Sequence, residues 1–168
     1  MDVGKSPQLM RGPLGGRIRI KSMLRFARSS QRWWNKPLVN EGGEELPAEL
    51  VILRSVLRPG EEGAWMNSRG RKTGVAALEW AEDGSAKTIR CNLPDFVASA
   101  LGEIYEQADL SRGCPDLVVW NRSARTLRLI EVKCPHWDRP SNDQQQFMRV
   151  AGARGIPTEV VEWEFVER

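Results

Sequence analysis

The sequence predicts a mixed α/β domain in which helices pack against a β-sheet. Two short apolar runs with alternating polarity, joined by a polar turn, predict paired strands within residues 116–133. Apolar residues recur at helical spacing in 47–58 and again in 94–108. A capped helix pattern followed by a last strand occupies 141–166. The order helix, strands, helix, strand, strand, helix, strand is typical of this fold class.

The size and composition of the chain predict one folded domain that needs no disulfides. The 168 residues suffice for a buried core. The three cysteines, Cys91, Cys114 and Cys134, form no disulfide framework, which favours a reducing compartment inside the cell, the cytoplasm, nucleoid or nucleus. No apolar run is long enough to span a membrane, so no membrane partner is expected.

Positive charge is concentrated at the N-terminus. Residues 1–36 contain nine Lys and Arg against one acid, a net charge of +8 that leaves −5 for the remainder of the chain. We therefore divide the chain into a basic, flexible arm over 1–45, with a short helix around 22–34, and a folded domain over 46–168. Such an arm suggests a polyanionic partner. A solvated, disordered tail and an organelle-targeting segment at 23–34 are the alternatives.

The first predicted elements follow the arm. Leu50, Leu53, Val56 and Leu57 share one face of a helix that begins near Pro47 and ends at 59–60, where Pro and Gly stop it. Strands at 75–81 and 86–91 are joined by a turn at Asp83-Gly84, which predicts a hairpin.

The second half of the chain contains the clearest pattern. A helix over 94–108 precedes two strands, 116–120 and 126–133, which are joined by a turn over 121–125. Ser141 is placed to cap the last helix and Gly155 to end it. A final strand covers 158–166.

Ionisable residues interrupt the second of these strands. Alternation puts Glu131 and Lys133 on one face, and pairing of the two strands brings Asp116 to the same end of the sheet. Two carboxylates, with the carbonyl of Val132, can hold a hard divalent cation, and a neighbouring ammonium suits phosphodiester hydrolysis. The alternative is a surface ion pair between Glu131 and Lys133 on an edge strand.

Several motifs in order carry a family resemblance over about 111–163. They are Gly113-x-Pro115-Asp116, Glu131-Val132-Lys133 followed by Pro135, Asp138-Arg139-x-Ser141, and Gln144 on the last helix. Together they resemble the VRR-NUC domain of the PD-(D/E)xK nuclease superfamily, as found in the C-terminal nuclease of Fanconi-associated nucleases. Cys134, Trp137 and Pro140 depart from the family pattern in the loop near the site.

The resemblance implies a restriction-endonuclease-like core and an Mg²⁺- or Mn²⁺-dependent DNA nuclease. Asp116, Glu131 and the Val132 carbonyl would be metal ligands, Lys133 the catalytic lysine and Gln144 a supporting residue. The family also supplies a glutamate from an early helix, for which Glu49 is the first candidate and Glu45 the second. Glu49 is equally explained as an exposed first-turn acid. The residues expected to contact DNA phosphates are Arg69, Arg71, Lys72 and Arg139.

The function that follows is a divalent-metal-dependent deoxyribonuclease of repair or recombination. It is expected to select branched, flapped or junction DNA, because no base-reading motif is present. The alternative is a nucleic-acid-binding module with the same fold and negligible catalysis. The resemblance leaves the oligomeric state open, because standalone family members tend to form dimers whereas the multidomain relatives are monomers. Trp137, beside the site loop, is expected to pack or to stack on a splayed base.

Overall fold

The computed structural model describes residues 10–11, 17–20, 24–33, 36–66 and 72–166, with side chains from 24–29, 36–66 and 72–166. The described helices are α1 (Ala48–Val56), α2 (Asp95–Ala108) and α3 (Asn142–Ala153). The described strands are β1 (Met10–Arg11), β2 (Arg17–Ile20), β3 (Leu24–Trp33), β4 (Lys36–Glu41), β5 (Glu44–Leu46), β6 (Glu61–Trp65), β7 (Thr73–Trp80), β8 (Ala86–Asn92), β9 (Leu117–Asn121), β10 (Thr126–Lys133) and β11 (Thr158–Phe165).

One mixed sheet joins the described strands. Its order is β5-β4-β3-β11-β10-β9-β6-β7-β8, and β1 and β2 form an additional pair next to β11. β11 pairs in parallel with β10 on one side and with β2 and β3 on the other, whereas β9, β10, β6, β7 and β8 meet antiparallel. The mixed α/β class predicted from the sequence is therefore confirmed.

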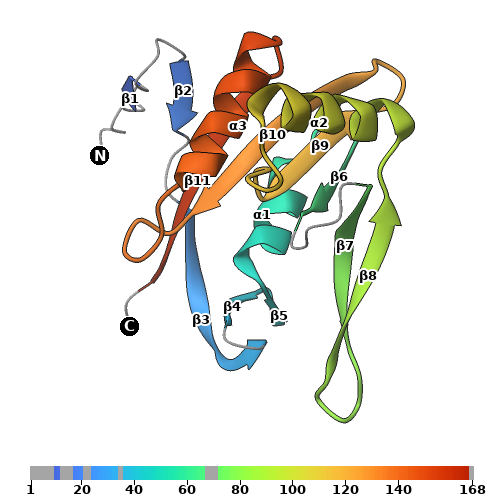
Figure 1. Cartoon of the computed structure of the whole chain (residues 1–168). Coiled ribbons are helices and arrows are strands. Elements are labelled where there is room, and N and C mark those ends of the chain that lie inside the picture. Colours follow the sequence, from blue (N-terminus) through green and yellow to red (C-terminus); the bar gives the residue numbers. More distant parts are fainter. Residues whose placement is uncertain (1–9, 12–16, 21–23, 34–35, 67–71, 167–168) are drawn as a thin grey trace.

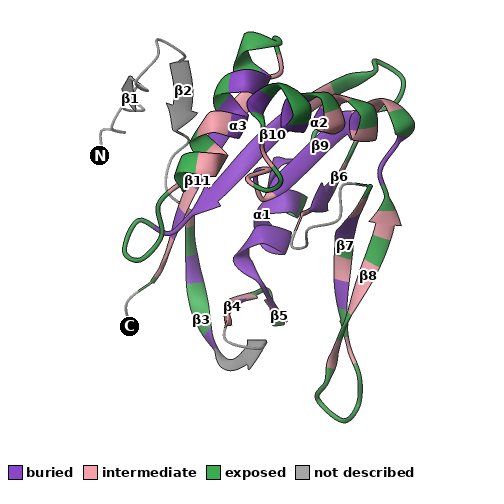
Figure 2. Ribbon diagram, viewed as in Figure 1, coloured by how far each residue is buried: buried purple, intermediate pink, exposed green. Residues whose placement is uncertain are grey.

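Helices cover both faces of the central strands (Figure 1). α1 packs beside β4 and β6 over a core that includes Leu38, Ile52 and Ile130. α2 and α3 pack on each other over the opposite face, where Leu129 and Phe147 are fully buried. Figure 2 shows that burial is concentrated in β9, β10 and α1. This places the residues at the ends of β9 and β10 next to the best-packed part of the molecule.

Most of the predicted elements are confirmed after residue 46. The two helices predicted at 47–58 and 94–108 are α1 and α2, and the hairpin around Asp83-Gly84 is β7–β8. Ser141 caps α3, and Gly155 follows its end with φ of +77°. None of the helices in the described part of the chain is both long and apolar enough to span a bilayer.

The region before residue 46 differs from the expectation. Within the predicted 1–45 arm, β3, β4 and β5 are strands of the sheet, and Leu38 and Val39 are completely buried. The predicted helix at 22–34 is wrong, because 24–33 form β3. Apolar residues are sparse in this region, so no local pattern reveals these strands. β3 is ordered by pairing with β11, β4 by pairing with β3, and β5 by pairing with β4.

Candidate active site

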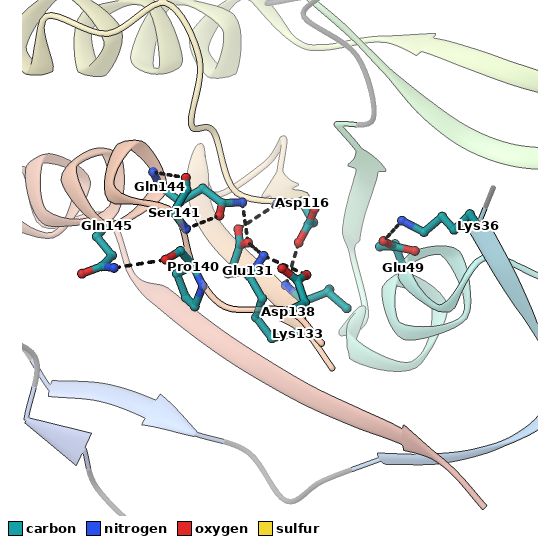
Figure 3. A network of polar contacts seen from close by, with 11 residues as sticks. Lys36, Glu49, Asp116, Glu131, Lys133, Asp138, Pro140, Ser141, Gln144 and Gln145 are labelled. Atoms are coloured by element: carbon teal, nitrogen blue, oxygen red, sulfur yellow. Dashed lines mark hydrogen bonds and ion pairs between the residues drawn. The ribbon is translucent and has the colours of Figure 1, made fainter. Parts of the chain in front are cut away.

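Asp116, Glu131 and Lys133 converge at one end of the β9–β10 hairpin, as the sequence predicts (Figure 3). The antiparallel register pairs Ile130 with Leu117, so the next step places Glu131 opposite Asp116. Lys133 Nζ lies 2.5 Å from Glu131 Oε1. The Asp116 backbone N–H donates to Glu131 Oε2 (3.3 Å), and Asp116 Oδ2 accepts from the Val132 backbone N–H (2.9 Å). Two carboxylates and one ammonium are thus held by the sheet itself.

Gln144 joins the first turn of α3 to this cluster. Its backbone N–H donates to Ser141 Oγ (3.2 Å), and its side-chain oxygen accepts from the Ser141 backbone N–H (2.9 Å). This reciprocal pair is a capping box. The amide nitrogen of the same side chain donates to Glu131 Oε1 at 2.5 Å. The cap that begins the helix therefore also orients a site carboxylate.

Gly113 allows the chain before Asp116 to pass close to α3. Its φ of +107° lies in the left-handed region, which side-chain-bearing residues rarely adopt. A Cβ on Gly113 would lie 2.7 Å from the backbone C and O atoms of Asp143. Arg112 fixes the same approach from the surface, because its Nε donates to Asp143 Oδ2 at 2.6 Å. The glycine of the G-x-P-D motif thus sets the distance between Asp116 and Gln144.

Asp138 is a second partner of the catalytic-lysine candidate. Its Oδ2 accepts from Lys133 Nζ at 3.1 Å. A tight turn places it there, since the backbone N–H groups of Trp137 and Asp138 both donate to the Cys134 carbonyl, at 3.1 and 2.9 Å. The sequence marks Asp138 as part of a motif but assigns it no role. The structure shows that it holds the ammonium from the solvent side.

Glu49 lies in the first turn of α1 with only 7% of its surface exposed. One carboxylate oxygen pairs with the Lys36 ammonium, while Oε2 is buried with no hydrogen-bond partner. In Figure 3 this pair lies on the far side of Asp116 from Lys133. The alternative that Glu49 is an exposed acid is wrong. Glu45, the second candidate, instead accepts from Ser29 Oγ at 2.7 Å.

Lys36 is the site residue that sequence reasoning missed. It begins β4, inside the stretch expected to be an arm, and its ammonium lies 5.1 Å from the centre of the Trp65 ring. A cation held over an aromatic face is stabilised electrostatically, more so when it is partly desolvated. No local pattern around Lys36 signals this role, because its partner is on a different element.

Negative charge exceeds positive charge within the cluster. Burial, and then repulsion from Glu49, raises the pKa of Asp116, although the Val132 N–H opposes this rise. Burial, and then repulsion from Asp116, raises the pKa of Glu131. Burial lowers the pKa of Lys133, but the contact with Glu131 outweighs it and the pKa is raised overall. The carboxylates therefore sit where an additional cation would be favourable.

The balance of charges in the cluster also indicates that an additional cation would be favourable. Among the described residues, the cluster contains two ammonium groups, Lys36 and Lys133, and four carboxylates, those of Glu49, Asp116, Glu131 and Asp138. In the described part of the chain, no three His, Cys, Asp or Glu side chains are arranged as a complete ion-binding group. Mg²⁺ commonly takes one or two carboxylates and completes its shell with water and phosphate oxygens. The hard oxygen donors of Asp116 and Glu131 fit such an ion.

The residues predicted to contact DNA are only partly described. Arg69 and Arg71 lie outside the described residues. Lys72 and Arg139 are exposed, so both ammonium and guanidinium groups are accessible to a phosphate.

Comparison with known proteins finds one matching family. Residues 92–163 match the VRR-NUC domain. The family resemblance carried by the motifs is thereby confirmed, and the match supports nuclease chemistry. The VRR-NUC segment contains Asp116, Glu131, Lys133 and Gln144, whereas Glu49 and Lys36 precede it.

Solved structures similar to this chain include two of paFAN1. One is bound to DNA with a 2nt 5′ flap and a gap; it is 25% identical over 45% of this chain and 14% of that chain, with a TM-score of 0.35. The other is bound to DNA with a 1nt 5′ flap and a gap, at 24% identity over the same shares, with a TM-score of 0.34. The matched segment thus spans about one seventh of the length of paFAN1. No curated protein matches the chain.

Proposed function

We propose that this protein is a divalent-metal-dependent DNA nuclease that hydrolyses phosphodiester bonds in branched or flapped DNA. The observation that carries the proposal is the convergence of Asp116, Glu131 and Lys133 at one sheet end, inside the VRR-NUC segment. The preference for flaps or junctions is supported by the family, and by the flapped DNA bound in the paFAN1 structures.

Asp116 and Glu131 would hold the ion, with the Val132 carbonyl as a third oxygen donor. The first carboxyl is half-buried and the second fully buried, so an ion or a phosphate approaches from the side of Asp116. When bound, Mg²⁺ or Mn²⁺ polarises the phosphate and lowers the pKa of its water. Gln144 keeps Glu131 in one orientation through a 2.5 Å hydrogen bond and needs no rearrangement to do so.

Lys133 would act on the reacting phosphate. Its ammonium already contacts Glu131 and Asp138, which restricts it to one position beside the carboxylates. From there it can orient the attacking water and offset the negative charge that develops on the phosphate. Glu49, with its unpartnered buried oxygen, is placed to accept a hydrogen bond from a water on the other side of Asp116.

Cleavage of end-labelled DNA tests the proposal. Flap, four-way junction, single-stranded and duplex substrates are compared across a titration of Mg²⁺ and of Mn²⁺. We expect cleavage near the branch point that requires the ion, and a loss of about 10²- to 10⁴-fold in Asp116→Asn and in Lys133→Met. Arg122→Met, which removes only an exposed ion pair with Glu62, is the matched control and should cut normally.

The binding experiment distinguishes the alternative function. If wild type and both site variants bind the DNAs equally and none of them cuts, the nuclease proposal is overturned and the chain is a binding module. Retained cleavage in Asp116→Asn would overturn the assignment of the site.

A further inference from the structure

An exposed aromatic patch lies beside the proposed active site. Among the described residues only two large hydrophobic side chains are exposed, Trp137 (56%) and Val166 (50%). Trp137 lies 6.0 Å from Phe165, ring centre to ring centre, and Val166 follows Phe165 directly. We call Trp137, Phe165 and Val166 the aromatic patch. Trp137 and Val166 are exposed and Phe165 is half-buried, and apolar side chains grouped at a surface mark an interaction site more often than an isolated residue does.

The indole of Trp137 is held in place from beneath. Its ring meets the buried Trp163 edge to face, with centres 5.8 Å apart, and Phe165 packs on the same Trp163 at 5.0 Å. Packing therefore explains one side of Trp137, as the sequence suggests. Packing on Trp163 does not explain why more than half of the Trp137 side chain remains in solvent.

The turn after β10 connects this patch to the site. Trp137 and Asp138 donate their N–H groups to the same Cys134 carbonyl, so the two side chains leave one rigid turn. Asp138 contacts Lys133, while Trp137 contacts β11. Adjacent Cα atoms are about 3.8 Å apart, so Trp137 and Asp138 leave the turn from neighbouring positions. Figure 1 shows this turn beside the end of β11.

Cationic side chains flank the patch and make a nucleic acid its best-matched occupant. The Arg28 guanidinium lies 3.9 Å from the Phe165 ring centre, and Arg25 is largely exposed while it pairs with Glu164. His136, next to Trp137, is exposed, and its Nε2 lies 3.2 Å from the same Glu164 carboxylate. Aromatic faces with neighbouring arginines are the arrangement that binds single-stranded nucleic acid, since bases stack and phosphates pair with the cations. A base inside an intact duplex has no free face to offer.

We propose that Trp137 stacks on an unpaired nucleobase of the DNA near the bond that the enzyme cuts. The proposal deepens the nuclease function and rests on it. Trp137 is then a substrate-positioning residue that favours DNA with a splayed or single-stranded base at the cleavage point. Arg25 and Arg28 contact the phosphates of the same strand.

Fluorescence of a base analogue tests this directly in the full chain. A flap DNA carries 2-aminopurine one or two nucleotides from the branch point, and EDTA in the buffer prevents cleavage. Stacking quenches 2-aminopurine, so wild type and Trp137→Phe should quench it on binding. Trp137→Leu keeps the apolar contact with Trp163 but has no ring, so it should quench little and bind flap DNA about 5- to 150-fold more weakly.

A blunt-ended duplex, which has no unpaired base, is the matched control DNA. We expect wild type and Trp137→Leu to bind it equally. Equal quenching and equal flap affinity in Trp137→Leu and wild type would overturn the stacking proposal, and so would an equal loss on both DNAs. A change of oligomeric state in Trp137→Leu, measured by light scattering, would show instead that a second copy of the chain covers the patch.

The result separates this inference from the nuclease proposal. If wild type cuts flap DNA with Mg²⁺ but Trp137→Leu behaves like wild type in every assay, only the stacking inference fails. If wild type neither binds nor cuts DNA, the proposed function itself fails. Thermal denaturation of each variant confirms that Trp137→Leu and Trp137→Phe fold before they are compared.

Discussion

Replacing Lys133 by methionine would show how strongly the active-site charges depend on one another. Lys133 is almost fully buried, and Glu131, 2.5 Å away, has no exposed surface. Methionine keeps most of the apolar stem but removes the charge, which leaves a buried carboxylate with hydrogen bonds from Gln144 and Asp116 only. Removing one partner of a buried ion pair typically costs about 3–5 kcal/mol. We expect a loss of this size in the free energy of unfolding.

Urea denaturation at pH 8 with EDTA measures this loss without a contribution from bound metal. Arg122→Met, which breaks the exposed Arg122–Glu62 pair, is the control and should change stability far less. The double variant Glu131→Leu/Lys133→Met replaces the pair by apolar groups and should recover most of the loss. The loss is therefore assigned to the stranded charge rather than to a missing side chain.

The pH dependence of the free energy of unfolding gives an independent check that the stranded Glu131 charge causes the loss. Burial raises the pKa of Glu131 above its ordinary value even with Lys133 present, and without Lys133 it rises further. Between the unfolded and folded pKa values the folded state binds more protons than the unfolded state, so stability falls as pH rises. The loss in Lys133→Met should thus shrink as the pH is lowered from 8 towards 5. A loss no larger than that of Arg122→Met, or one independent of pH, would refute the reasoning.

Two further predictions follow from the same geometry. Gly113→Ala should lower the free energy of unfolding by about 1–3 kcal/mol, because φ is +107° and the new Cβ would meet the Asp143 backbone. Gly102→Ala, in an open position on α2, should instead raise the free energy of unfolding. Urea denaturation measures both changes, and the same sign for both would contradict the argument. Mg²⁺ should raise the melting temperature more at pH 8 than at pH 5.5, because protons compete for Asp116 and Glu131, whose pKa values burial raises. Asp116→Asn should show almost no Mg²⁺ effect, and a wild-type effect of equal size at both pH values would count against the proposed ligands.

Sequence reasoning located the site because its central part is local. Asp116, Glu131 and Lys133 lie on two strands joined by a short turn, and alternation together with antiparallel pairing is enough to place them together. Gln144 was found through the family motif, and the capping box explains how a helix residue reaches the strand. In both cases neighbouring residues carry the signal.

The rest of the site depends on contacts that no local pattern encodes. Lys36 meets Glu49 because α1 packs beside β4, and β4 joins β10 and β9 only through β3 and β11, which lie far apart in the sequence. The arginines and lysines in 1–36 favour a solvated arm when they are considered alone. In β3 some of them, such as Arg25 and Arg28, instead meet a carboxylate or an aromatic ring of β11. Such pairings between distant segments require the fold to be known.

The central place of β11 has a consequence for how the protein is made. Among the described strands, β3, β4 and β5 connect to β10 within the sheet only through β11, which occupies 158–165. A ribosome synthesises β11 after all the strands it joins, so the early segment waits for a late one before it can pair. Lys36 therefore takes its final position relative to β10 only after β11 has joined β3 to β10. Until then, the growing polypeptide lacks the part of the sheet that carries Lys36.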